Sequence, residues 1–290
     1  MVKRLFIPGS QWIYFKIYTG EQTADNILIE NVMPFIHTLY NEGVIMGSFF
    51  VRYSDPLFHL RLRLYVDKLE SYATIFSNLL VFLEPCLNNG SIFRIMCDTY
   101  NRELERYGNE LIKYVEEIFC IDSWSILSLL SILQKYDEDL REYERWNLSL
   151  LLIDDLLNVF DFDGKSKKQY LCMLSEQLKL EHGFINHKFT KQLNDKYRTN
   201  KSNVWRTMDR ENSVVYIKYS DILNRRKNDL EEITKKLNKE ELQWISDYSL
   251  SSLIHMTMNR FFKSKNRLHE MVIYFFLYKY YDSYLARFEI

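Results

Sequence analysis

The spacing of apolar and polar residues divides the chain into two parts with different periods. Up to about residue 108, short runs of apolar and aromatic residues alternate with polar ones, which is typical of half-buried β-strands. From residue 109 onward, apolar residues recur every three to four positions, which predicts amphipathic helices. We therefore expect an α+β fold in which an antiparallel sheet from the N-terminal third packs against a large helical body.

The domain organisation follows from the scarcity of breaking residues. The 290 residues include only 8 glycines and 4 prolines, and no internal repeat or linker rich in Gly, Ser or Pro interrupts them. We predict a single domain over residues 1–290, made of a sheet-rich portion, 1–108, and a mainly helical portion, 109–290.

The same patterns locate the individual elements. Strands are predicted at residues 12–18, 48–53, 59–66 and 93–99. A turn around Pro56 joins the second and third of these strands into a hairpin. Helices are predicted at 24–40, 68–83, 109–120, 123–134, 138–160, 166–181, 213–237, 239–261 and 267–287. Residues 183–212 are polar and mixed in pattern, and we interpret them as a mobile loop.

The strand predicted at residues 59–66 carries the most informative polar pattern. Its three leucines share one face, whereas His59, Arg61 and Arg63 share the other. The two guanidinium groups would leave the sheet about 7 Å apart, and arginine stays charged at any working pH. Two such groups on one face suit a carboxylate ligand. The alternative is a solvated strand face whose charges pair with nearby acidic residues.

A second polar cluster, at residues 100–108, follows a predicted strand and ends in Gly108, as a strand-to-helix connection would. The acidic residues Glu103 and Glu105 are placed to orient Arg102 or Arg106 through salt bridges. An ordinary run of surface charges is the alternative interpretation.

A third cluster lies in the predicted helix 239–261, where His255 and Asn259 are four residues apart and share a face. Histidine is the side chain that titrates near neutrality unaided, so it suits proton transfer. A structural histidine is the alternative. The sequence contains no HExxH, GxSxG, P-loop or GxGxxG pattern, so the common hydrolase, kinase and nucleotide-binding interpretations have no support.

Charge and cysteine content exclude several classes of protein. The net charge of -1 does not provide the global basic excess of a nucleic-acid binder, so any anion site must be local. The four cysteines are scattered without a CxxC pair, so we expect neither structural zinc nor a disulfide framework. A reducing, cytoplasmic compartment is the default expectation, with a peripheral position at the membrane left open.

Four segments in order carry a family resemblance. They are PGSQWIYFKIY at 8–18, FFVRYSDP and HLRLR within 49–63, ELERYG at 103–108, and IHM followed by NR within 254–260. Together they resemble the C-terminal domain of class I lantibiotic dehydratases, the nisin-dehydratase type, also called the thiopeptide-type bacteriocin biosynthesis domain. Order and spacing agree from residue 8 to about 287, so the resemblance covers nearly the whole chain.

The resemblance implies a function and partners. In this family, a large N-terminal part uses glutamyl-tRNA to esterify Ser and Thr of a precursor peptide, and the small C-terminal part removes the glutamate. This chain resembles only the second part. The resemblance therefore implies a stand-alone lyase of lanthipeptide or thiopeptide biosynthesis that yields dehydroalanine or dehydrobutyrine. Its partners would be the glutamylated precursor peptide and a separate tRNA-dependent glutamylating subunit, without direct nucleic-acid contact. It implies no metal or organic cofactor, and it leaves a homodimer open.

The resemblance also assigns site residues. It assigns catalysis to Arg63, Arg106 and His255. Substrate binding is assigned to Arg61, Arg52 and His59. We expect the arginines to grip the glutamyl carboxylate and its ester, and His255 to act as general base, with a protonated, electrostatic role as the alternative. Many relatives carry a second histidine where this chain has Thr257, which puts the surroundings of His255 in doubt.

Two other functions stay open. Thiopeptide pyridine synthases resemble the same domain but perform a formal [4+2] cycloaddition of two dehydroalanines, and they are expected to lack the elimination arginines and histidine. A non-catalytic module that holds the peptide or bridges partner enzymes is the second. RNA binding is disfavoured by the net charge.

Overall fold

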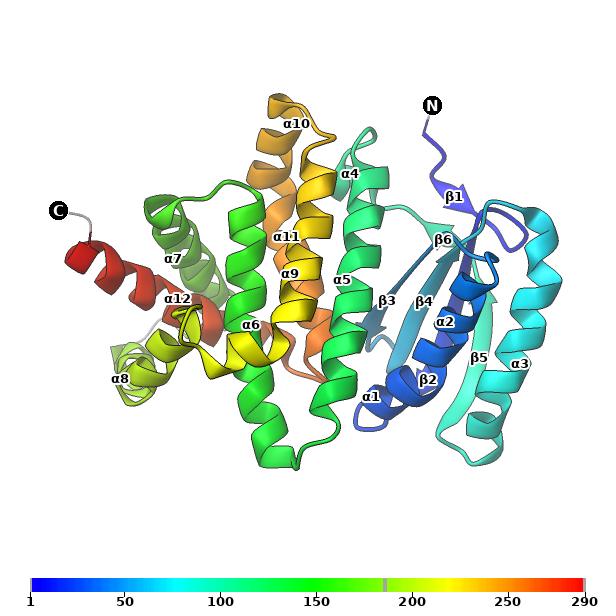
Figure 1. Ribbon diagram of the computed structural model, residues 1–290, viewed down its shortest axis with the longest axis horizontal. Helices are drawn as coiled ribbons and strands as arrows, with labels where there is room; N and C mark the ends of the chain where they lie inside the picture. Colours follow the sequence, from blue (N-terminus) through cyan, green and yellow to red (C-terminus); the bar gives the residue numbers. More distant parts are fainter. Residues whose placement is uncertain (1, 185–186, 289–290) are drawn as a thin grey trace. The chain divides into compact units, whose positions relative to one another are not determined.

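The computed structural model describes residues 2–184 and 187–288, and its ribbon is shown in Figure 1. The chain forms two compact units, each described by itself below. Unit 1 comprises Met1–Ile132, Gln243–Ser249 and Asn259–Ser264. Unit 2 comprises Leu133–Leu242, Leu250–Met258 and Lys265–Ile290. The chain therefore contributes three separate segments to each unit.

Unit 1 is built on a four-stranded antiparallel sheet. Its strands are β2 (Trp12–Thr19), β3 (Gly47–Tyr53), β4 (His59–Tyr65) and β5 (Ile92–Asp98), in the order β3-β4-β2-β5. The first connection contains α1 (Ala24–Ile27), a π-helical turn (Leu28–Val32) and α2 (Met33–Asn41), and the last contains α3 (Tyr72–Asn88). This is the β-α-β-β-α-β arrangement of split βαβ folds. The α+β prediction is confirmed, and the four predicted strands are present.

Both connecting helices cover the same face of this sheet. The leucines of β4 are fully buried on that face, and Phe15 of β2 contacts Phe76 of α3 there, with ring centroids 5.6 Å apart. Asp25 of α1 reaches the same face through its ion pair with Arg52 of β3. Figure 1 shows α2 and α3 on one side of the strands. Because side chains alternate along a strand, the residues between the leucines of β4 point to the opposite face.

Unit 1 also contains a short second ribbon and two more helices. Strand β1 (Leu5–Phe6) pairs with β6 (Tyr100–Asn101), and α4 (Leu104–Tyr107) and α5 (Ile112–Leu133) follow. The prediction of two helices at 109–120 and 123–134 is wrong, since α5 is continuous. Asp122 does not cap a new helix, because its carboxylate pairs with the buried guanidinium of Arg260 at 2.9 Å.

Unit 2 is helical. It contains α6 (Glu138–Val159), α7 (Gly164–Glu181), α8 (His187–Met208), α9 (Val214–Thr234) and α12 (Asn266–Phe288). Before α12 the chain forms α10 (Lys239–Trp244), a π-helical turn (Ile245–Ser249) and α11 (Leu250–Phe261). Of these, residues 239–242 and Leu250–Met258 belong to unit 2. Side chains of Asp137, Asp163 and Ser213 cap the first turns of α6, α7 and α9.

The expectation of a loop at 183–212 is wrong for most of that segment, because α8 occupies residues 187–208. Residues 185–186 lie outside the described part of the chain. Most residues of α8 are polar, so the sequence pattern did not indicate its narrow apolar stripe. Leu193, Tyr197, Val204 and Met208 nevertheless recur at helical spacing and are buried.

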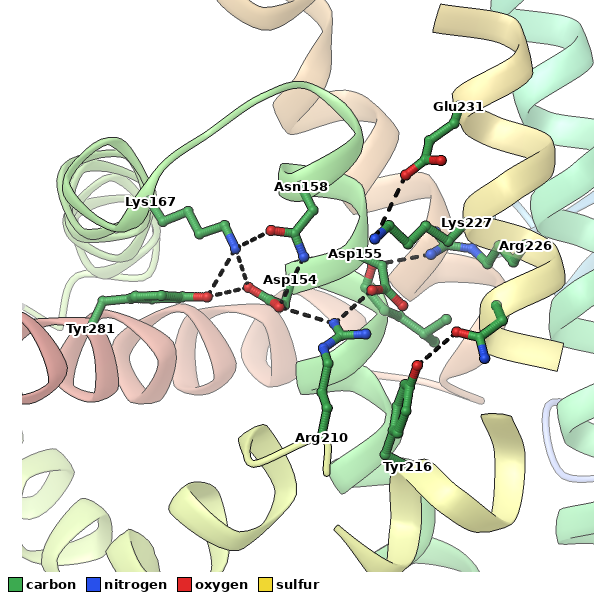
Figure 2. A network of polar contacts seen from close by, with 12 residues as sticks. Asp154, Asp155, Asn158, Lys167, Arg210, Tyr216, Arg226, Lys227, Glu231 and Tyr281 are labelled. Atoms are coloured by element: carbon green, nitrogen blue, oxygen red, sulfur yellow. Dashed lines mark hydrogen bonds and ion pairs between the residues drawn. The ribbon is translucent and has the colours of Figure 1, made fainter. Parts of the chain in front are cut away.

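A buried polar network joins the helices of unit 2 (Figure 2). The Asp154 carboxylate accepts hydrogen bonds from Lys167 at 2.6 Å, from Arg210 at 3.0 Å and from the Tyr281 hydroxyl. Arg210 also pairs with Asp155 at 2.6 Å. Burial by itself would raise the pKa of Asp154, but the cations of Lys167 and Arg210 outweigh it and lower that pKa. These contacts connect α6, α7 and α12 with the segment after α8.

Among the described residues, no helix combines the length and apolar character that crossing a membrane requires.

Candidate functional site

The face of the sheet opposite α2 and α3 carries the two arginines of β4. In the strand register, Arg63 lies opposite Tyr14 of β2 and Phe49 of β3. Arg61 lies opposite Lys16 of β2. Because β4 is an inner strand, both guanidinium groups have neighbours from strands on either side. The predicted sharing of one face by Arg61 and Arg63 is confirmed.

Arg63 is a buried cation enclosed by aromatic rings. Its guanidinium carbon lies 4.6 Å from the ring centroid of Tyr14, 4.7 Å from Tyr100 and 5.1 Å from Phe49. The side chain is only 9% exposed, and within the described part of the chain its Nε has no hydrogen-bond partner. Burial lowers the pKa of the Arg63 guanidinium. Cation–π contacts compensate part of the desolvation.

Arg61 is held in place by His59 and Tyr53. Its Nε donates to His59 Nε2 at 3.2 Å, and its guanidinium carbon lies 3.3 Å from the Tyr53 ring centroid. His59 Nδ1 lies 2.8 Å from the carbonyl oxygen of Leu57. An imidazole that accepts at Nε2 must carry its proton on Nδ1, which donates to that carbonyl.

His59 is thereby fixed as a neutral imidazole. Burial lowers its pKa, and the neighbouring cations of Arg61 and Lys16 lower it further. Both ring nitrogens of His59 are engaged, so its contacts are those of a residue that orients Arg61. Strand alternation placed His59 and Arg61 on one face but did not predict the hydrogen bond between them.

Lys16 completes the positive face and was not among the predicted site residues. Lys16 Nζ forms an ion pair with Asp98 of β5. This contact raises the pKa of Lys16 and lowers that of Asp98. The alternation WIYFKIY places Lys16 and Tyr14 on one face, so the signal was present in the sequence.

Arg106 lies on the short helix α4 and is half exposed. Its Nη1 lies 3.1 Å from Glu103 Oε2, with 50% of the Arg106 side chain exposed. Glu103 is also close enough to Arg63 to act on its charge and raise its pKa, against the larger effect of burial. Glu103 therefore contacts Arg106 and acts on Arg63 through its charge.

The remaining charges of this cluster pair elsewhere. Glu105 binds Arg4 through two contacts of 2.6 and 3.0 Å. Arg102 binds Glu116 through contacts of 2.7 and 2.5 Å. Of the salt bridges expected from Glu103 and Glu105, only the one between Glu103 and Arg106 forms in the described structure.

The C-terminal end of α4 is fixed by two contacts. The backbone carbonyl of Arg106 accepts a hydrogen bond from Ser249 Oγ at 2.9 Å. Gly108 follows with a φ of 77°, and an added Cβ would lie 3.2 Å from the Trp244 ring. A residue other than glycine would be strained there on both counts.

Arg52 lies on the leucine face of the sheet, apart from Arg61 and Arg63, since its register partner is Leu60. Its Nη2 donates to Asp25 at 2.6 Å, and its Nε donates to the carbonyl of Arg260 at 3.0 Å. The Asn259 side chain also bonds the Arg52 backbone, at 2.9 and 3.0 Å. These contacts tie β3 to α1 and to the end of α11. They differ from the substrate-binding position that the motif suggested for Arg52.

His255 lies in the part of α11 that belongs to unit 2, and Glu270 of α12 holds it. His255 Nδ1 lies 2.8 Å from Glu270 Oε1, with His255 28% exposed and Glu270 fully buried. Tyr274 donates to the other carboxylate oxygen at 3.2 Å, and Arg267 Nη1 lies 3.4 Å from it. Sequence reasoning missed Glu270, which gives no local signal because it lies fifteen residues beyond His255 in another helix.

Thr257, which stands where many relatives carry a second histidine, has a structural position. It is buried, and its hydroxyl donates to the Leu253 carbonyl one turn earlier at 3.1 Å. The structure thus brings Arg61, Arg63 and Arg106 into unit 1, and it places His255 in unit 2. Among the residues that the structure describes, no group of three or more His, Cys, Asp or Glu side chains is arranged to hold a metal ion.

Comparison with known proteins gives a family and a fold. The model of the family described as "Lantibiotic biosynthesis dehydratase C-term" matches residues 12–281. Nisin biosynthesis protein NisB of Lactococcus lactis subsp. lactis is 24% identical over 275 residues, which cover 94% of this chain and 26% of NisB. The chain therefore spans about a quarter of the length of that relative.

Two solved structures share the fold. One is the crystal structure of the tRNA dependent lantibiotic dehydratase MibB from Microbispora sp. 107891, with a TM-score of 0.74 and 18% identity over 97% of this chain and 29% of MibB. The other is the pyridine synthase TbtD from thiomuracin biosynthesis, with a TM-score of 0.63 and 9% identity over 96% of this chain and 99% of TbtD.

Proposed function

We propose that this chain, which belongs to the lantibiotic biosynthesis dehydratase C-terminal family, is a lyase that removes glutamate from glutamylated Ser and Thr side chains of a precursor peptide. Its products would be dehydroalanine and dehydrobutyrine in a lanthipeptide or thiopeptide precursor. Arg63 carries the proposal. It is a buried cation that forms no ion pair with the described carboxylates, and it shares a face with Arg61.

The reaction sets two chemical demands. A base must take the Cα proton of the esterified residue, and the resulting charge must be stabilised on the adjacent carbonyl oxygen. As the electrons of the Cα–H bond form the Cα=Cβ bond, the Cβ–O bond breaks and glutamate leaves as a carboxylate. A carboxylate leaving group needs little protonation, so fixed positive charge matters more than a strong acid.

The arginines meet the demand for positive charge. Arg63 and Arg106 would bind the glutamyl carboxylate and its ester, and Arg61 would support them. Arginine cannot be the base, because a guanidinium stays protonated at neutral pH. His59 would keep Arg61 in position through the hydrogen bond from Nε to Nε2. The proposal requires that Arg63, Arg106 and His255 act on the same substrate molecule.

His255 would be the base. Its contact with the buried Glu270 carboxylate favours the tautomer with the proton on Nδ1, which leaves Nε2 able to accept a proton. The charge of Glu270 would then stabilise the imidazolium that forms, as the carboxylate does in Ser-His-Asp triads.

The substrate would come from an earlier reaction. We propose that a tRNA-dependent glutamylating subunit esterifies the peptide before this chain acts on it. Glutamyl-tRNA is a cytoplasmic molecule, so this chain would meet its substrate in the cytoplasm. A net charge of -1 argues against direct contact between this chain and the tRNA.

The decisive experiment is mass spectrometry of a synthetic glutamyl-Ser peptide incubated with this protein alone. Loss of the whole glutamate with formation of dehydroalanine would support elimination. Release of glutamate with regenerated Ser would identify an esterase and overturn the proposal. With the glutamylating partner present, Arg63→Ala, Arg106→Ala and His255→Ala should each accumulate glutamylated peptide.

A pyridine synthase is the second candidate, because this chain covers 99% of TbtD, a protein of that function, at a TM-score of 0.63. Incubation with a peptide that already carries two dehydroalanines tests it directly. Formation of a six-membered nitrogen ring there, with no action on glutamyl-Ser, would favour cycloaddition. A non-catalytic peptide-binding role predicts that the Arg63→Ala and His255→Ala variants behave as wild type.

A further inference from the structure

Among the described residues, three buried hydrogen-bond donors on the arginine face lack partners, one of them Trp12 Nε1, and the other two lie on neighbouring strands. Those two are the Tyr14 hydroxyl and Arg63 Nε. They belong to paired residues, since Tyr14 and Arg63 lie opposite each other on β2 and β4. The Arg63 guanidinium lies 4.6 Å from the centre of the Tyr14 ring. Buried polar groups are nearly always satisfied, so two adjacent exceptions need an explanation.

The other polar groups around them are already engaged. Lys16 is paired with Asp98, and Arg61 donates to His59. The buried carboxylate of Glu116 accepts from Tyr100 at 2.8 Å and from Arg102. The described acids around this point, Asp98, Glu103 and Glu116, are each paired with another cation, whereas these donors are unpaired, which is the composition of a site for an anion.

The charge of the face favours the same class of ligand. Arg61, Arg63 and Lys16 all act on Tyr14 with positive charge, and Asp98 is the opposing acid. Burial is the larger effect and raises the pKa of Tyr14. The hydroxyl therefore keeps its proton, so Tyr14 can donate a hydrogen bond but cannot serve as the base.

We propose that the Tyr14 hydroxyl binds substrate, donating with Arg63 Nε to the carboxylate of the glutamate that leaves. This inference rests on the proposed function and adds a residue outside the arginine and histidine set. The carboxylate has two oxygens in one plane, so a phenol and a guanidinium edge can each take one. No covalent bond to Tyr14 forms and no proton leaves it. Its contribution grows as negative charge develops on the departing oxygen.

The test compares Tyr14→Phe with Tyr219→Phe. Tyr14→Phe removes only the unpartnered hydroxyl and keeps the ring against Arg63. Tyr219 is a buried tyrosine of α9 in unit 2, so its variant controls for loss of any buried hydroxyl. Two quantities are measured for each full-length protein: the elimination rate on a glutamyl-Ser peptide, and the affinity for free L-glutamate by titration calorimetry.

Tyr14→Phe should eliminate about 10- to 100-fold more slowly than wild type and bind L-glutamate about 10-fold more weakly. Its melting temperature should equal or exceed that of wild type, because an unsatisfied buried group has been removed. Tyr219→Phe should match wild type in rate and affinity.

The outcomes separate this inference from the proposed function. A wild type that eliminates, with Tyr14→Phe equal to it in rate and affinity, would overturn the role of Tyr14 alone. A clear loss of stability in Tyr14→Phe would also overturn it, since the hydroxyl would then have a structural partner. If wild type does not eliminate, the proposed function fails, whereas L-glutamate binding that depends on Tyr14 would still support the carboxylate site.

Discussion

Nδ1 of His255 lies 2.8 Å from a carboxylate oxygen of Glu270, and that carboxylate is fully buried. The two residues come from consecutive helices, α11 and α12. Tyr274 donates to the second oxygen of Glu270 at 3.2 Å, so the carboxylate is oriented independently of the histidine. An imidazole held in this way has a fixed ring orientation and a defined tautomer.

Glu270→Gln tests whether this orientation serves proton transfer. The amide keeps the size of the side chain but removes the charge that would stabilise an imidazolium. We expect kcat for elimination to fall about 100-fold or more while KM changes little. Single-turnover mass spectrometry of a glutamyl-Ser peptide measures both. Glu176→Gln, an exposed position on α7, is the control, and an equal effect of the two substitutions would exclude a specific role for Glu270.

Arg63→Met separates function from stability. Methionine fills the space among the rings without a buried charge. An unsatisfied buried donor costs about 1–3 kcal/mol, and the ring contacts return about 0.5–2 kcal/mol. The free energy of unfolding should therefore be equal to or higher than that of wild type. Elimination should fall at least about 100-fold.

Urea denaturation and the elimination assay measure the two effects of Arg63→Met. A strong loss of stability would indicate that Arg63 has a structural partner, and unchanged elimination would remove it from the mechanism.

Arg106→Ala should affect catalysis without affecting the fold. The ion pair of Arg106 with Glu103 is half exposed, and exposed ion pairs contribute less than about 1 kcal/mol. Its backbone contact with Ser249 does not depend on the side chain. We expect glutamylated peptide to accumulate at nearly unchanged thermal stability. Arg198→Ala, an exposed residue of α8 that also pairs three residues away, should eliminate as wild type does.

His59 predicts a pH dependence of stability. Its pKa in the folded protein is lowered by burial, so the unfolded chain takes up a proton at a higher pH than the folded protein does. The stability that depends on neutral His59 is therefore complete above the unfolded pKa of about 6.5. It is lost as the pH falls from there toward the lowered folded pKa, at no more than about 1.4 kcal/mol per pH unit.

The measurement is urea denaturation of wild type and His59→Gln between pH 7.5 and about pH 5. The advantage of wild type over His59→Gln should shrink as the pH falls. His187→Gln, a change at an exposed histidine, is the control for loss of an imidazole as such. A constant difference for His59→Gln would contradict the assignment of a buried, neutral imidazole.

The sheet and its arginine face could be predicted because strand alternation is a local rule. Once residues 59–66 are recognised as a strand, Arg61 and Arg63 must share a face. The position of Arg52 could not be predicted in this way. Its face relative to Arg63 depends on the hairpin register, which pairs Arg52 with Leu60, and the turn sets that register.

The contacts of the site could be predicted less well than its strands. Glu270 contacts His255 only because two helices pack together, which the sequence does not show. The helix α8 (residues 187–208) was not predicted because most of its residues are polar. The break predicted between helices at 109–120 and 123–134 falls at Asp122. In the structure Asp122 lies in mid-helix, where a distant arginine, Arg260, compensates its charge. Long-range pairing of charges thus decided the differences at Glu270 and Asp122.

The interleaving of the two units has a practical consequence for dissecting this protein. The strand β3 depends on Asn259 and Arg260, which lie more than 200 residues further along the chain. A fragment ending near residue 132 would keep Asp122 and Arg52 but lose their partners, Arg260 and Asn259. Such a fragment would retain a buried carboxylate whose compensating cation is missing, and loss of one member of such a pair costs about 3–5 kcal/mol. Genetic separation of the arginine-bearing half therefore requires grafting the two short late segments onto it.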